Sequence, residues 1–288
     1  MAGIGSTQTL APGLYFVATP IGAARDITLR GLDILRSADV IAAEDTRSLR
    51  HLMDIHGIAL GDRALLSYHD HNGERVRPRI LAALAAGKSV AYASEAGTPL
   101  VADPGYQLGV ATIAAGHMVT AAPGPSAVLA ALTVSGLPSD RFLFAGFAPN
   151  SSGQRRRWLE ELRGVPATLV LYESPKRVHA LLNDMIATFG GSRPAAVCRE
   201  LTKKFEEVTR GTLDEIVAAF AERTLKGEIV VLIDRARGVT AGADEIEAAL
   251  REALACQTVK DAAASVAELT GAPKREVYQR ALKLAAER

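Results

Sequence analysis

The chain has 288 residues, of which 48% are hydrophobic, and its formal net charge is only +1. This length predicts about two domains, and the balanced charge excludes a global basic field, so that any nucleic-acid contact must come from local patches. No apolar run approaches the roughly 18 residues of a membrane span, and Cys198 and Cys256 form neither a disulfide framework nor a CxxC pair. These features favour an ordinary cytoplasmic enzyme.

Strand-like and helix-like segments alternate over the first half of the chain. Residues 1–12 are small, polar and Gly-rich, which predicts a disordered tail rather than a signal peptide. Apolar runs predict strands at 14–19, 40–43, 89–93 and 118–122, and helical patterns lie at 28–37, 74–86 and 106–115. This alternation predicts a mostly parallel sheet covered by helices.

A second cycle begins after the Gly/Pro/Ser-rich segment at 146–153. Strands are predicted at 168–172, 195–199 and 228–233, with a helix at 178–189. Three helices follow at 244–255, 258–270 and 273–287, and Thr258 with Asp261 resembles a capping box. The sequence therefore predicts an α/β protein with domains at 13–124 and 125–238 and a helix-turn-helix-like extension at 239–288.

Two stiff corners follow predicted strands. One contains Gly97-Thr98-Pro99 and Asp103-Pro104-Gly105, and the other is the segment 123–127, Pro-Gly-Pro-Ser-Ala. Glycine lets the backbone approach a ligand, and proline fixes the turn. Because ligands of open α/β sheets bind at the carboxyl ends of strands, these corners predict a ligand held largely by main chain.

Familiar nucleotide and metal motifs are missing from the sequence. No GxGxxG follows the first strand, where Thr-Pro-Ile-Gly stands at 19–22, and no GxxxxGK[ST] occurs. His69 and His71 flank Asp70, but no further ligand stands at a zinc-like spacing. We expect no metal site, and the histidines are either partly exposed loop side chains or substrate contacts.

Charged residues gather at several strand ends, in the segments 44–47, 172–177 and 199–204. They could form exposed salt bridges worth about 0–1 kcal/mol each, and Thr46 could simply cap a helix. Their recurrence at successive strand ends favours a role in binding a substrate.

Eight short motifs occur in a characteristic order: TPIG, EDTR, AGTP, DPGY, PGPSA, SGLP, YESP and RELTK. Together they resemble the ribosomal RNA small-subunit methyltransferase I family of the tetrapyrrole-methylase superfamily, over about residues 14–233. The resemblance implies two α/β lobes with S-adenosylmethionine in the cleft between them, and a homodimer. It also implies 2′-O-methylation of a cytidine near the decoding site of 16S ribosomal RNA in the small ribosomal subunit.

The resemblance also assigns residues to roles. The expected cofactor-binding residues are Gly97, Thr98, Pro99, Pro123, Gly124, Ser126, Ala127, Tyr172, Glu173 and Ser174. Two positions depart from the family pattern, because Glu95 replaces an aspartate and Lys176 replaces a histidine. A lysine accepts a proton only when its pKa is strongly lowered, so that Lys176 is expected to contact phosphate.

In-line methyl transfer needs orientation and electrostatic support from the protein. The candidate bases are Glu44, Asp45 and Glu200, with Lys203 stabilising the developing alkoxide. The basic RNA contacts are expected to be Arg25, Arg47, Arg50, Arg155, Arg156, Arg157 and Lys176. Tyr68 is expected to stack on a base, whereas the arginine triplet could instead be a solvated helix start.

Two other functions fit parts of the sequence. A small-molecule methyltransferase acting on a tetrapyrrole of the precorrin type would share the fold and the cofactor. An inactive RNA-binding scaffold is the other alternative, suggested by Glu95 and Lys176. The EDTR and RELTK motifs and the arginine triplet suit a polyanion better than a macrocycle.

Overall fold

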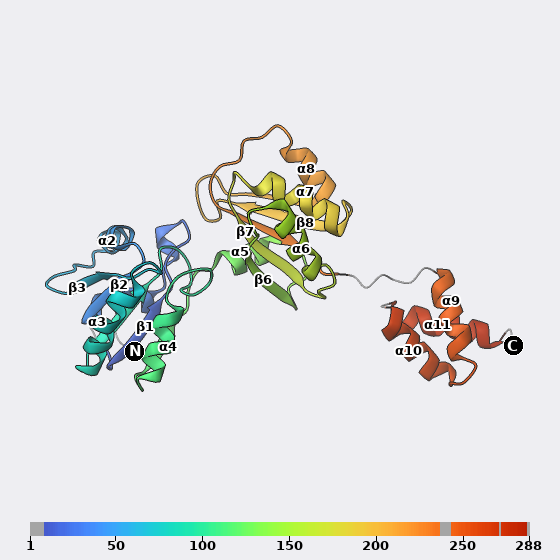
Figure 1. Cartoon of the computed structure of the whole chain (residues 1–288), viewed down its shortest axis with the longest axis horizontal. Coiled ribbons are helices and arrows are strands. Elements are labelled where there is room, and N and C mark those ends of the chain that lie inside the picture. The colour runs from blue at the N-terminus through green and yellow to red at the C-terminus, as the bar shows by residue number, and fades with distance from the viewer. Residues whose placement is uncertain (1–8, 237–242, 271, 287–288) are drawn as a thin grey trace.

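The computed structural model describes residues 9–236, 243–270 and 272–286, so that most of the tail predicted at 1–12 lies outside the described residues. Within the described residues the strands form two five-stranded sheets. Figure 1 shows the two α/β lobes built on these sheets and, apart from them, the group of C-terminal helices.

The first lobe contains a fully parallel sheet in the order β3-β2-β4-β1-β5. Leu14 and Phe16 pack into a core on one face of the sheet, while Tyr15 and Val17 pack into a core on the other face. Burial on both faces is typical of parallel sheets and explains the continuous apolar runs. The prediction of a parallel sheet covered by helices is confirmed here. The elements are β1 (Gly13–Val17), a 3₁₀ turn (Ala24–Asp26), α1 (Leu29–Ser37), β2 (Val40–Ala43), α2 (Thr46–Ile55), β3 (Ala64–Ser67), α3 (Gly73–Ala85), β4 (Ser89–Ala93), α4 (Tyr106–Ala114) and β5 (Val119–Ala122).

The second lobe has the order β6-β7-β10-β8-β9, and only the β6–β7 pair is parallel. The sheet of this lobe is therefore mostly antiparallel, unlike that of the first lobe. The connection from β8 to β9 spans only residues 200–206, which is too short for the crossover that parallel neighbours require. The elements are α5 (Ala127–Ser135), β6 (Phe142–Phe147), α6 (Ser152–Leu162), β7 (Thr168–Glu173), α7 (Val178–Phe189), β8 (Pro194–Arg199), β9 (Glu207–Thr212), α8 (Leu213–Phe220) and β10 (Ile229–Ile233).

Three contacts tie the lobes together at the ends of β1 and β4. The Thr98 hydroxyl donates to the Pro125 carbonyl at 2.8 Å, and the Ala23 amide donates to the Thr202 hydroxyl at 3.0 Å. Gly22 lies so close to the second lobe that a Cβ there would stand 2.5 Å from Lys203 Cγ. The lobes therefore meet through loops rather than through a shared sheet.

The C-terminal helices α9 (Ala243–Ala253), α10 (Val259–Thr270) and α11 (Lys274–Ala286) share a core of their own that includes Leu250, Val266 and Val277. The Asp261 amide donates to the Thr258 hydroxyl at 3.2 Å, which confirms the predicted cap of the second helix. In the part of the chain that the structure describes, no helix combines the length and the apolar character needed to cross a membrane.

Candidate functional site

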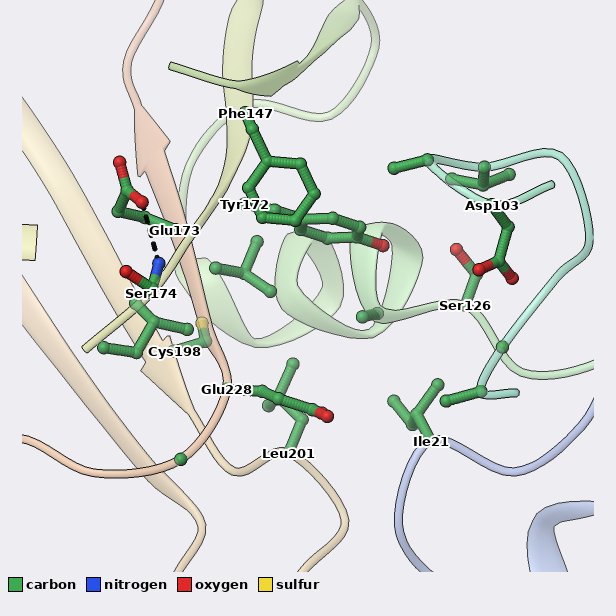
Figure 2. A pocket seen from close by; sticks show the side chains of 18 of the residues that line it. Ile21, Asp103, Ser126, Phe147, Tyr172, Glu173, Ser174, Cys198, Leu201 and Glu228 are labelled. Atoms are coloured by element: carbon green, nitrogen blue, oxygen red, sulfur yellow. Dashed lines mark hydrogen bonds between the residues drawn. The ribbon is translucent and has the colours of Figure 1, made fainter. Parts of the chain in front are cut away.

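A cavity of ≈ 440 Å³ lies between the lobes, and it is called the interlobe cavity below (Figure 2). Its volume lies in the range of small-molecule sites. From the first lobe it is lined by Ile21, Glu95, Ala96, Gly97, Thr98, Val101, Ala102 and Asp103. From the second it is lined by Ser126, Ala127, Phe147, Tyr172, Glu173, Ser174, Pro175, Cys198, Leu201, Gly227, Glu228, Ile229 and Val230.

The Gly97 backbone lies in the cavity wall in a left-handed conformation, with φ +86°. Its amide donates to the Thr19 carbonyl at 3.0 Å and its carbonyl accepts from the Thr19 amide at 2.9 Å. The Ser94 hydroxyl donates to the same carbonyl at 2.7 Å. The amide and the carbonyl of Gly97 are thus already hydrogen-bonded to other residues of the protein. Gly97 contributes to the site by its lack of a side chain, which leaves room for a ligand.

Seven of the ten predicted cofactor residues line the interlobe cavity, and Pro99, Pro123 and Gly124 do not. Gly124 must be a glycine for a steric reason, because a Cβ there would lie 2.9 Å from the Cβ of Ala18. Direct ligand contact at these three positions stays a prediction.

The Tyr172 ring lies across the cavity and directs its hydroxyl toward the side that holds Asp103 (Figure 2). Phe144 and Phe147 pack edge-on against this ring, with centroids 4.8 and 5.6 Å away. Burial and then the charge of Asp103 raise the pKa of Tyr172 to about 12, against a hydrogen bond from the Val128 amide. The phenol is therefore a neutral, well-fixed wall of the site.

Glu173 is buried and acts as an anchor for the neighbouring loop. Its Oε1 accepts from the Ser174 amide at 2.8 Å. Its Oε2 lies 3.1 Å from Arg177 Nη2 without the geometry of a hydrogen bond. Arg177 in turn donates to the Ala148 carbonyl and the Asn150 side chain. This network fixes the segment that carries the exposed Lys176.

Three carboxylates in the cavity wall, Glu95, Asp103 and Glu228, were not among the predicted site residues. Burial, followed by the charge of Glu44 and a hydrogen bond with it, raises the pKa of Asp103 to about 8. Burial and the charge of Glu44 also raise the pKa of Glu95. The signal in the sequence was the Asp-Pro-Gly corner, only a few residues beyond Gly97.

None of the four predicted catalytic residues lines the interlobe cavity. Asp45 caps α2, accepting from the Arg47 amide at 2.8 Å, so that Asp45 and not Thr46 is the cap. Lys203 Nζ lies 3.0 Å from both Glu200 Oε1 and Glu228 Oε2. The Glu228 amide and Lys203 hold the pKa of Glu200 below its usual range.

A second, more open cavity of ≈ 430 Å³ lies at the ends of β2 and β3 and shares Glu95 with the first. Among the described residues no group of three or more His, Cys, Asp or Glu side chains is placed to hold a metal ion. The lining residues of this second cavity are Glu44, Asp45, Thr46, Arg47, Ser67, His69, His71 and Glu95.

Two of the predicted RNA contacts are contradicted by burial. Tyr68 is only 2% exposed and packs edge-on against Tyr92, at 5.7 Å between ring centroids, so that it cannot stack on a base. Arg155 is 4% exposed and pairs with the buried Asp184 at 2.6 Å. Arg156 also pairs with Asp184 but remains exposed. The other predicted basic contacts are exposed, namely Arg25, Arg47, Arg50, Arg157 and Lys176.

Replacing Thr98 with valine should weaken ligand binding to the interlobe cavity several-fold and destabilise the protein by about 0.5–1.5 kcal/mol. The reason is that the substitution removes the hydrogen bond that joins the two corners and leaves the Pro125 carbonyl without its donor. Calorimetric titration and chemical unfolding measure the two effects. Thr133→Val, which loses a similar hydrogen bond on the exposed side of α5, should leave ligand affinity unchanged. An equal loss of affinity in this control would refute a role for the hydrogen bond between Thr98 and Pro125.

Comparison with known proteins agrees with this architecture. A model of the family described as Tetrapyrrole (Corrin/Porphyrin) Methylases matches residues 13–217, and a model of the RsmI C-terminal HTH domain matches residues 240–285. A uroporphyrin-III-C-methyltransferase from Thermus thermophilus superposes with a TM-score of 0.55 at 22% identity, covering 77% of this chain and 94% of that chain. A structure of that enzyme complexed with S-adenyl homocysteine gives 0.54 at 21% identity, covering 76% and 96%. These likenesses show the fold.

Sequence relatives are much more similar. The ribosomal RNA small subunit methyltransferase I of Mesorhizobium japonicum is 49% identical over 278 residues, covering 96% of this chain and 94% of that protein. The protein of the same name from Escherichia coli O157:H7 is 41% identical over 276 residues, covering 94% of each. With its two lobes and its C-terminal helices, the chain belongs to the tetrapyrrole methylase family and, within it, to the ribosomal RNA small subunit methyltransferase I proteins.

Proposed function

We propose that this protein transfers a methyl group from S-adenosylmethionine to the ribose 2′-oxygen of a cytidine in 16S ribosomal RNA, near the decoding site and in the cytoplasm. The observation that carries the proposal is the 41–49% identity to proteins of that name over nearly the whole chain. The small ribosomal subunit is the proposed substrate particle.

The chemistry of the interlobe cavity suits this cofactor. Ile21, Leu201 and Val230 form an apolar wall for an adenosine group. The positive charge of a bound sulfonium would favour the ionised forms of Asp103 and Glu95, which attract it in turn. The N-terminus of α5, at Ser126, faces the cavity and would favour the carboxylate of the methionine part. When bound, the cofactor supplies an electrophilic methyl group, and the protein supplies its orientation.

The proposed RNA surface is a set of exposed cations around the cavities. The Arg47 side chain is 92% exposed and lines the second cavity, next to the carboxylates at the ends of the strands. Arg25, Arg50, Arg157 and Lys176 are exposed as well. Side chains of this kind bind phosphates without reading sequence, so that the fold must position the acceptor nucleotide by shape.

Replacing Arg47 with alanine should weaken binding to small ribosomal subunits and lower the slope of log affinity against log salt by about 1, as expected when one phosphate contact is lost. Filter binding at several salt concentrations measures this slope. Arg79→Ala, which also removes an exposed arginine, here on α3, is the matched control and should leave the slope unchanged. Identical slopes for both variants and the wild type would remove Arg47 from the RNA surface.

We also propose a homodimer. The exposed side chains Tyr106, Val110 and Ile113 recur along one face of α4, and the neighbouring Met118 is exposed too. An apolar helix face of this kind marks an interaction surface, and a second copy of the chain is the proposed occupant. The mass of the protein in sedimentation equilibrium tests the proposal.

The direct test of function incubates the protein with radiolabelled S-adenosylmethionine and small ribosomal subunits from a strain that lacks the gene. Label on one cytidine ribose is the expected result. Label absent from the RNA, with calorimetry still showing cofactor binding, would point to a different acceptor such as a tetrapyrrole. If the cofactor does not bind either, the chain is an inactive scaffold.

A further inference from the structure

We propose that the ring of Phe205 stacks on an unpaired RNA base next to the acceptor cytidine and so holds the strand at the interlobe cavity. The inference rests on the proposed function and adds an RNA contact to it. Phe205 lies in the connection between β8 and β9 and is 62% exposed, the most exposed of the seven phenylalanines. Because single exposed apolar side chains are common, it is the loop around Phe205 that points to a ligand.

This loop is built from two successive turns. The Lys203 amide donates to the Glu200 carbonyl at 3.0 Å, and the Glu206 amide donates to the Lys203 carbonyl at 3.1 Å. The Glu206 carboxylate also accepts from the Thr202 amide at 2.6 Å across the loop. Glu200 and Thr202 have left-handed backbones, with φ +51° and +64°, and such strain concentrates at functional sites. The ring is therefore carried by an ordered backbone, which lowers the entropic cost of binding.

The loop is attached to the interlobe cavity and to the first lobe. Leu201 lines the cavity (Figure 2), and Phe205 follows it by four residues, a chain length of at most about 14 Å. The Thr202 hydroxyl accepts from the Ala23 amide at 3.0 Å, and the exposed Arg25 lies two residues after Ala23. The ring is thus within reach of the nucleotides that flank one whose ribose enters the cavity.

The charges beside Phe205 suit a polyanion. Lys204 is exposed, and its ammonium lies 5.5 Å from the centroid of the ring. No carboxylate of the described residues pairs with this ammonium. Glu207, by contrast, is neutralised by Arg199 at 3.0 Å and Arg223 at 2.8 Å. Lys204 can therefore contact a phosphate while the ring stacks on a base of the same strand.

An RNA base fits this surface better than an apolar protein partner does. Phe205 stands between lysines at 203 and 204 and glutamates at 206 and 207, and both residue types are depleted in the cores of protein interfaces. Sites for single-stranded RNA combine an aromatic ring with basic groups, and unpaired bases are splayed out to stack on phenylalanine. The combination at this loop is of the second kind.

The first experiment measures, by filter binding, the affinity for small ribosomal subunits from a strain that lacks the gene. Phe205→Ala should weaken binding about 5- to 150-fold, which corresponds to about 1–3 kcal/mol for one stacked base. Phe205→Leu keeps an apolar side chain without a π face and should lose at least about fivefold, whereas Phe205→Trp should bind as tightly as the wild type. Phe142→Ala, the same change at another exposed ring, on β6, is the matched control and should leave affinity unchanged.

The second experiment repeats these titrations at several salt concentrations. Stacking releases no counterions, so that Phe205→Ala should lower affinity equally at every salt concentration and keep the slope of log affinity against log salt. Lys204→Ala should instead reduce the magnitude of this slope by about 1. A merely structural role for Phe205 would not separate the two variants in this way.

The third experiment uses the fluorescence of Phe205→Trp. A tryptophan stacked on a base should be quenched when small ribosomal subunits are added. The wild type contains only Trp158, and its signal under the same conditions provides the correction.

Several outcomes would overturn the inference. They are an affinity of Phe205→Leu within twofold of the wild type, an equal loss in Phe142→Ala, or a tryptophan at position 205 that is not quenched in the complex. A lower mass of Phe205→Ala in sedimentation equilibrium would place the ring between protein copies instead. Phe205 does not line the interlobe cavity, so that an equal loss of S-adenosylmethionine affinity would show a distorted loop and would also refute stacking.

These binding measurements do not depend on turnover. A wild type that binds the subunit through Phe205 but transfers no methyl group would contradict the proposed function and leave the stacking role intact. A wild type that transfers the methyl group and tolerates Phe205→Leu would contradict the stacking role alone. A wild type that does not bind the subunit at all would overturn both.

Discussion

Replacing Asp184 with alanine should lower the free energy of unfolding by about 3–5 kcal/mol, the cost of leaving a buried charge without its partner. Asp184 lies on α7 and is 3% exposed. It accepts hydrogen bonds from Arg155 at 2.7 Å, Arg156 at 2.6 Å and the Ser152 hydroxyl at 3.1 Å. Without this carboxylate the Arg155 guanidinium stays buried and uncompensated. Urea unfolding followed by circular dichroism measures the difference.

Arg156→Ala is the control for this prediction. The Arg156 side chain is 58% exposed, and its ion pair should contribute no more than about 1 kcal/mol. Equal effects of the two substitutions would mean that Arg155 finds other partners. The pH dependence gives a second check. Burial acts to raise the pKa of Asp184, but the hydrogen bonds from Arg156, Arg155 and Ser152 outweigh it and hold the pKa below 3.8.

A lowered pKa in the folded state has a defined consequence for stability. The contribution of Asp184 is fully present above its unfolded-state pKa and is lost as the pH falls through the lower folded value. The gap between the wild type and Asp184→Ala should therefore be constant from neutral pH down to about 5 and narrow on further acidification.

Gly97→Val should lower the affinity for S-adenosylmethionine at least about tenfold, which is about 1.4 kcal/mol. A branched side chain is strained at φ +86°, and a Cβ there would already lie 3.3 Å from the Ile21 side chain in the cavity wall. The rest of the valine would occupy part of the interlobe cavity. Calorimetric titration measures the affinity.

Gly87→Val is the control that separates the effect of backbone strain from the effect of filling the cavity. Gly87 has a similar left-handed backbone, with φ +75°, but a Cβ there would meet nothing within 4 Å. It lies between α3 and β4, outside both cavities. This variant should lose stability but keep its affinity. If both variants bind the cofactor as tightly as the wild type, Gly97 does not border the bound ligand.

The first lobe was predictable because its strands are continuous apolar runs, such as the one at 89–93, and such runs are typical of buried parallel strands. The second lobe was harder. β9, with the sequence EVTRGT, is polar and half-buried. Its pairing with β8 follows from the short connection between the two strands, which the pattern of apolar residues does not indicate. The direction of strands in a mixed sheet is a property of tertiary structure.

The errors at the site have a common cause, which is that burial of a polar side chain depends on a distant partner. Arg155 lies in a run of three arginines that looks solvated, and Asp184, the residue that permits its burial, is 29 positions away. Leu159, one turn after Arg155 and buried on the same face of α6, was the local signal. Tyr68 directly follows β3, and only packing against Tyr92 shows that its ring lies inside.

Asp103 was missed for the opposite reason. Its motif was noticed as a rigid corner, but its distinction comes from the carboxylates of Glu44 and Glu95 on neighbouring strand ends. The strand order places β2 beside β4, and that adjacency is what brings these side chains together. Linear sequence indicates which residues end strands, whereas the order of strands decides which of them meet.

The division of the cavity walls between two lobes has a thermodynamic consequence. A ligand bound there contacts both lobes, so that any opening that separates them must first release it. By linkage, a ligand present at 100 times its dissociation constant adds about 2.7 kcal/mol to the free energy of such an opening. The C-terminal helices have a core of their own, so that the bound ligand does not raise the free energy of their local unfolding. Ligand occupancy therefore sets how cooperatively the two lobes unfold, and amide exchange should slow in both lobes together.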